Sequence, residues 1–102
     1  MGLRTNLQKE LESLLGSANV YFQPPSSYRL KYPCIVYERS PSRTLNSDNR
    51  IYKIFHHYTV KIIYTNPDSD LPDRMLESFQ YCSHDRHFVA DNLYHEVFDL
   101  YY

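Results

Sequence analysis

Residues 50–65 alternate between two kinds of side chain. The even positions are apolar or aromatic except for one histidine: Tyr52, Ile54, His56, Tyr58, Val60, Ile62 and Tyr64. The odd positions are mostly polar, with Lys53, His57, Thr59, Lys61 and Thr65. A period of two is typical of a β-strand with one face on a core. At about 3.3 Å per residue this strand would span roughly 50 Å, so we expect its N-terminal part to project as a β-arm.

Two other stretches have the spacing of amphipathic helices. In residues 3–15 the leucines fall on one side of a helix, at Leu3, Leu7, Leu11, Leu14 and Leu15. Gly16 follows as the expected C-cap. A second helix is expected to begin at Asp70, an acidic N-cap followed by Pro72. Its apolar stripe comprises Leu71, Met75, Leu76 and Phe79, so both helices should cover one face of a sheet.

The remaining strands are shorter. Residues 19–23 predict an edge strand, because Pro24 and Pro25 follow it and proline lacks the N–H that a central ladder needs. Residues 33–39 are apolar on both faces, which favours an interior strand. Residues 81–89 and 93–102 predict a hairpin that turns at residues 90–92. The order is α-β-β-β-α-β-β, a single two-layer α+β domain over residues 1–102 with a mainly antiparallel sheet and both helices on one face.

Residues 40–50 are polar and rich in turn formers, so we expect an extended hairpin loop before the long strand. A connection of about ten residues is longer than most hairpin loops, and long ordered loops tend to be functional. Basic residues lie in or beside it at Arg39, Arg43, Arg50 and Lys53. Two interpretations stay open: these residues contact a partner, or they keep a strand edge soluble.

The composition narrows the range of functions. The 102 residues carry a formal net charge of -1 and include eleven tyrosines, which are frequent at interfaces. The charge argues against a dedicated nucleic-acid-binding protein, although aromatic strand faces leave a small nucleic-acid-binding α+β domain as a less favoured alternative. Cys34 and Cys82 lack metal-ligand spacing, and we expect buried thiols. We expect neither a secretion signal nor a membrane span. The protein should therefore be cytosolic where it is made.

One group of residue types resembles a metal site. Cys82, His84, Asp85 and His87 all have side chains that ligate zinc. Successive side chains of a strand alternate between faces, so Cys82 and His84 should point one way and Asp85 and His87 the other. Only a β-bulge could gather them. We therefore expect no metal site.

The sequence likewise predicts no catalysis. Ser83, His84 and Asp85 are the residue types of a nucleophilic triad, but three consecutive strand residues cannot hydrogen-bond in the required series. With Gly2 and Gly16 as the only glycines, a phosphate-binding glycine loop is excluded. We expect no catalytic residue and no cofactor.

Three stretches of the chain carry a family resemblance. They are residues 19–25 (Asn-Val-Tyr-Phe-Gln-Pro-Pro), residues 32–38 (Tyr-Pro-Cys-Ile-Val-Tyr-Glu) and the end of the chain, from residues 85–86 through 91–95 to 101–102. Together with the turn at residues 67–69 they look like the small tail terminator, or tail completion, proteins of long-tailed bacteriophages. The resemblance covers nearly the whole chain and contains no catalytic motif.

The resemblance implies a structural protein of the virion, in the neck region of the tail. Such a protein forms a ring, commonly hexameric, on the last ring of the tail tube, stops polymerisation of the tail tube protein and docks to the head connector protein. DNA would pass through its channel without sequence-specific binding, and no membrane would be involved. The alternative is another head–tail connector component, such as a head-closure protein.

Two regions are then candidate partner contacts. The first is the basic segment with the arm, Arg39, Arg43, Arg50, Lys53 and Phe55. The second is the terminal hairpin, with Asp85, Arg86, Asp91 and Asn92. A closed rotational ring needs a different surface on each side of the subunit, and two such regions would supply them. Arg86 has a structural alternative, in which it ties the turn at Asp91 to the sheet.

Overall fold

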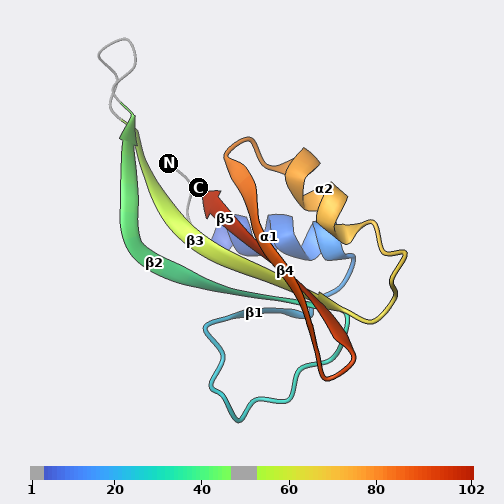
Figure 1. The fold of residues 1–102 in the computed structure, drawn as a ribbon. Helices are drawn as coiled ribbons and strands as arrows, with labels where there is room; N and C mark the ends of the chain where they lie inside the picture. Colours follow the sequence, from blue (N-terminus) through green and yellow to red (C-terminus); the bar gives the residue numbers. More distant parts are fainter. Residues whose placement is uncertain (1–3, 47–52) are drawn as a thin grey trace.

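The computed structural model describes residues 4–46 and 53–102, which form two helices and five strands. Their order is α1 (Arg4–Leu15), β1 (Val20–Phe22), β2 (Cys34–Asn46), β3 (Lys53–Tyr64), α2 (Leu71–Ser78), β4 (Cys82–Ala90) and β5 (Leu93–Tyr101). Both helices lie against one side of the sheet (Figure 1). The predicted α+β class and element order are confirmed.

The five strands form one sheet in the order β1-β2-β3-β5-β4. β1 runs parallel to β2, and every other neighbouring pair is antiparallel. β1 is therefore an edge strand and β2 an interior strand, as their sequences predict. β3 and β5 occupy the middle of the sheet, where the register sets Val60 opposite Tyr37 on one side and Phe98 on the other.

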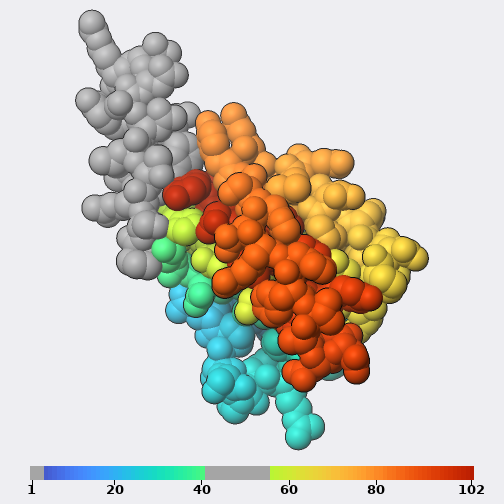
Figure 2. Space-filling model, viewed as in Figure 1, coloured from blue at the N-terminus to red at the C-terminus, as the bar shows by residue number. Residues whose placement is uncertain are grey.

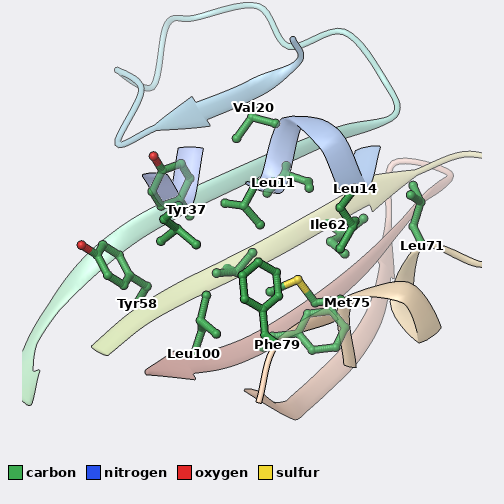
Figure 3. Packing of buried hydrophobic residues seen from close by; sticks show 14 of the residues in the cluster. Leu11, Leu14, Val20, Tyr37, Tyr58, Ile62, Leu71, Met75, Phe79 and Leu100 are labelled. Atoms are coloured by element: carbon green, nitrogen blue, oxygen red, sulfur yellow. The ribbon is translucent and has the colours of Figure 1, made fainter. Parts of the chain in front are cut away.

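The core lies between the helices and the sheet (Figure 3). It takes Leu7, Leu11 and Leu14 from α1, Leu71 and Met75 from α2, and every second residue of β3 from Tyr58 to Tyr64. The leucine spacing thus correctly predicted which side of α1 is buried. Gly16 ends that helix with φ +81° and donates its N–H to Glu12 O at 2.8 Å, which confirms the expected C-cap.

α2 differs from its expected form in two details. Leu76 is 43% exposed, whereas Leu71, Met75 and Phe79 are buried. Positions 71, 75 and 79 are spaced by four and form one line along the helix, and residue 76 lies off that line. Asp70 occupies the N-cap position but makes no side-chain cap hydrogen bond. Its carboxylate instead accepts a hydrogen bond from Arg74 Nε at 3.0 Å.

The β4–β5 hairpin forms the exposed front of the molecule in the space-filling view (Figure 2). Its turn contains Asp91 and Asn92 with φ of 54° and 62°. Two successive residues in the left-handed region define a type I′ turn, whose twist matches that of the flanking strands. The predicted hairpin is confirmed. β4 also contains an irregularity that was not expected, a register shift between His84 and Arg86 that leaves Asp85 as an extra residue.

β2 continues further along the chain than expected. β2 continues to Asn46 and pairs there with Lys53, so residues 40–46 of the expected loop are strand instead. The register shifts between Arg39 and Arg43, which places Pro41 in a bulge where its missing N–H breaks no regular ladder bond. The remainder of the expected loop, residues 47–50, lies outside the described residues.

Candidate functional site

The hairpin of β2 and β3 extends past both neighbouring strands. β1 ends where Phe22 pairs with Tyr37, and β5 ends where Tyr101 pairs with His57. Beyond these pairs, residues 40–46 and 53–56 form a two-stranded ribbon that leaves the body of the domain (Figure 1). We call residues 39–46 and 53–56 the arm. Its bounds confirm the expectation that the long strand projects from the domain.

The base of the arm is held by side chains and backbone together. The Arg39 guanidinium contacts the His56 ring across the two strands, with Nη2 3.1 Å from Nε2. The Arg39 N–H donates to Gln23 Oε1 at 3.2 Å, and the Tyr102 N–H donates to the His56 carbonyl at 3.0 Å. These contacts fix the direction in which the arm leaves the sheet.

The candidate contact residues fall into separate regions. Arg39 is exposed at the base of the arm, and the register places Arg43, Lys53 and Phe55 along its two strands. Arg50 lies outside the described residues. Asp91 and Asn92 lie at the β4–β5 turn, at the other end of the β3–β5 ladder from the arm. The arm and the turn are therefore two surfaces at opposite ends of one sheet.

Asp85 and Arg86 lie at the bulge in the middle of β4, not with the turn. Both are exposed, and Arg86 Nε is 3.9 Å from Asp85 Oδ2. The ion pair that Arg86 makes is thus with its neighbour rather than with Asp91, so the structural alternative for this arginine is wrong. An exposed pair of this kind contributes little to stability.

The bulge at Asp85 brings together a cluster of polar side chains that strict strand alternation would not predict. Strict alternation would put His84 and His87 on opposite faces, but the extra residue turns His87 to the same side as His84. Glu96 on β5 lies between them, with His84 Nε2 2.8 Å from Oε1 and His87 Nδ1 2.5 Å from Oε2. Tyr64 on β3 donates its hydroxyl to Oε2 at 2.7 Å. The expected placement of His84 and His87 on opposite faces is wrong.

Glu96 is buried, with a relative exposure of 7%, while the two histidines are exposed. Burial raises the pKa of the Glu96 carboxyl, but the hydrogen bonds from Tyr64, His84 and His87 outweigh it and lower that pKa overall. Burial and the hydrogen bond to Glu96 raise the pKa of Tyr64 to about 12. The carboxylate is therefore ionised at neutral pH and accepts hydrogen bonds from three side chains, tying β4 to β3 through β5.

Within residues 4–46 and 53–102, no group of three or more histidine, cysteine, aspartate or glutamate side chains has the geometry to hold a metal ion. The carboxylate oxygens of Glu96 are occupied by hydrogen-bond donors. The cluster joins strands, and its chemistry is that of a buried acceptor with satisfied donors.

The sheet face opposite the helices carries a different set of contacts. His57 Nε2 lies 2.8 Å from Asp99 Oδ1, within hydrogen-bond distance, and the His57 ring stacks on Tyr101 with centroids 4.8 Å apart. Phe88 and His95 stack at 4.5 Å. Ile63 and Val97 on this face are also buried, although both described helices lie on the other side of the sheet.

The two cysteines are free. Cys34 is buried, as expected. Cys82 is only half-buried, so the expectation of a buried thiol is met there in part. Burial raises the pKa of each thiol to about 11. Since the thiolate is the reactive form, both are poor nucleophiles at neutral pH.

No family model, curated protein or solved structure matches this chain. Neither of the helices described has the length and apolar character needed to cross a membrane.

Proposed function

We propose that this chain is a structural subunit of a phage tail terminator. In this role it assembles into a ring, hexameric by the resemblance, on the end of the tail tube in the virion neck, stops tube polymerisation and docks to the head connector. Its role is architectural rather than enzymatic. DNA passes through the ring without being read.

The observation that carries this proposal is the arm. A two-stranded ribbon without a third strand is marginally stable in water, because its side chains have little to pack against. The arm extends past β1 and β5, which are the strands that could have supported it. A partner outside the chain would give this part of the ribbon a surface to pack against.

Ring assembly suits the positions of the two candidate contact regions. In a closed rotational ring each subunit presents one surface to the neighbour ahead and a different one to the neighbour behind. The arm and the β4–β5 turn lie at opposite ends of the β3–β5 ladder. Each end of the subunit therefore has its own candidate surface for a neighbour, the tail tube or the connector.

The test is assembly of phage particles with and without this chain. We expect particles lacking it to have tails of uncontrolled length, because nothing ends polymerisation of the tube. Purified protein added to purified tail tubes should form a cap on one end, visible by electron microscopy. Normal particles in its absence would refute the proposal. Tails of normal length that fail to join heads would indicate the head-closure alternative instead.

A further inference from the structure

The arm and the rest of the chain carry opposite charges. The arm contains the basic residues Arg39, Arg43 and Lys53 and no acidic residue. Since the whole chain has a formal net charge of -1 and the arm contributes +3, the remainder has -4. The arm of one copy is therefore electrostatically complementary to the body of another, and opposite charges favour their encounter.

The arm is poorly suited to extending the sheet of a neighbour. A neighbour could offer two free sheet edges, β1 and β4. β1 has three residues and is followed by Pro24, whereas β4 is interrupted by the bulge at Asp85. Short strands, prolines and bulges are the features that block pairing at sheet edges. A contact through side chains on another surface fits the body better.

The exposed side of α2 is the surface that matches the arm. Asp73, Leu76 and Glu77 lie on one side of this helix and are all exposed, with Leu76 at 43%. Arg74, the one basic residue of α2, binds Asp70 and the Leu14 carbonyl. An exposed leucine between two carboxylates offers both the apolar contact and the charge that a basic ribbon requires.

The arm cannot make this contact within its own chain. In Figure 1 the arm leaves the sheet on one side of the molecule and α2 lies on the other. Two surfaces that are complementary but separated in one copy join head to tail in several copies.

We infer that the arm of one copy docks on the side of α2 formed by Asp73, Leu76 and Glu77 in the next copy. The inference rests on the ring proposed above and names one of its subunit contacts. The acidic residues alone would not indicate a partner. The basic arm in the same chain does, because it supplies the opposite charge on a ribbon that extends past the ladders of β1 and β5.

A charge swap between two variants tests the contact. The first variant reverses the arm, R43E/K53E, and the second reverses the helix, D73K/E77K. Each alone sets like charges against each other, so we expect neither to form the wild-type oligomer, either free or on tail tubes. Mixed together, each variant's arm again meets an opposite charge on the other's helix. We expect the mixture to form rings of alternating variants, measured by analytical ultracentrifugation and electron microscopy.

The controls separate this contact from misfolding and from general charge effects. Circular dichroism and thermal melting check that each variant folds, with D73N/E77Q as the milder helix variant if D73K/E77K does not. R29E/K31E and E38K reverse charges at exposed positions elsewhere and should assemble like the wild type. If each swapped variant alone forms the wild-type ring, the arm does not dock on α2, although the ring proposal stands. A wild-type chain that stays monomeric even with tail tubes refutes both.

Discussion

The Tyr64 hydroxyl donates a hydrogen bond to Glu96 Oε2 at 2.7 Å, from β3 to the neighbouring strand β5 on the helix-covered side of the sheet. Both side chains are buried. Glu96 also accepts from His84 and His87 on β4, so one carboxylate connects three strands. This arrangement adds side-chain hydrogen bonds to the backbone ladder that already joins the edge strand β4 to β5.

Removing the Tyr64 hydroxyl should weaken the fold by a measurable amount. Y64F deletes one donor to a buried carboxylate, and a hydrogen bond to a charged group contributes about 1.5–3 kcal/mol. Because two imidazole donors remain, we expect a loss near the lower figure in the free energy of unfolding, measured by urea denaturation. Tyr94, whose ring stacks on Tyr64 at 5.3 Å, gives the matched control. Y94F should change the stability by less than about 0.5 kcal/mol, and equal losses for both variants would contradict the role of the hydrogen bond.

Lowering the pH should decrease the stability of the domain, because it protonates the Glu96 carboxylate. The pKa of this carboxyl is lower in the folded protein than its ordinary value of 4.5, so the unfolded chain takes up the proton first as the pH falls. The stabilising contribution of ionised Glu96 is therefore complete above about pH 4.5, and it is lost as the pH falls through the pKa that this carboxyl has in the folded protein. Urea denaturation between pH 7 and pH 3 should show a smaller loss for E96Q than for the wild type. Parallel curves for the two proteins would show that Glu96 does not cause the acid dependence.

The sequence was sufficient for the parts of the fold that depend on local periodicity. The spacing of Leu7, Leu11 and Leu14 gave the buried side of α1, and Pro24 marked β1 as an edge. These features depend on the residues themselves and on their neighbours along the chain. The class and order of the elements followed from them.

The cluster around Glu96 could not be found in the same way. Whether His84 and His87 share a face depends on the bulge at Asp85, and a bulge is set by the register against a partner strand. Glu96 is on the other strand of the hairpin, and alternation alone gives it no special status. A search for acidic residues opposite paired histidines across a predicted hairpin would have been the available signal.

The length of β2 was underestimated for a related reason. Ser40, Pro41 and Ser42 are turn formers, so the segment reads as loop by composition. In the structure these three residues form a bulge in β2, and pairing with β3 resumes at Arg43 opposite His56. Pairing with the long strand continues because that strand keeps its extended conformation, and long-range pairing overrides local preference.

The β4–β5 turn should depend on backbone conformation at Asn92 rather than on its side chain. Asn92 has φ +62°. This left-handed conformation costs most residues roughly 1–2 kcal/mol, whereas glycine and asparagine adopt it readily. We expect N92A to destabilise the protein by about 1 kcal/mol and N92G to remain within about 0.5 kcal/mol of the wild type. Thermal melting of the three proteins measures the difference. If N92G loses as much as N92A, a side-chain contact of Asn92 is responsible instead.

Met75 and Leu76 are neighbours on α2 with opposite environments, and they separate stability from assembly. Met75 is 0% exposed in the core and Leu76 is 43% exposed. M75A should cost about 2–5 kcal/mol because it leaves a cavity, whereas L76A should change stability by less than about 0.5 kcal/mol. If the arm of a neighbouring copy packs on Leu76, L76A should still weaken oligomer formation in sedimentation experiments on the folded protein. An L76A variant that unfolds like M75A would place Leu76 in the core, and one that assembles normally would remove it from the subunit contact.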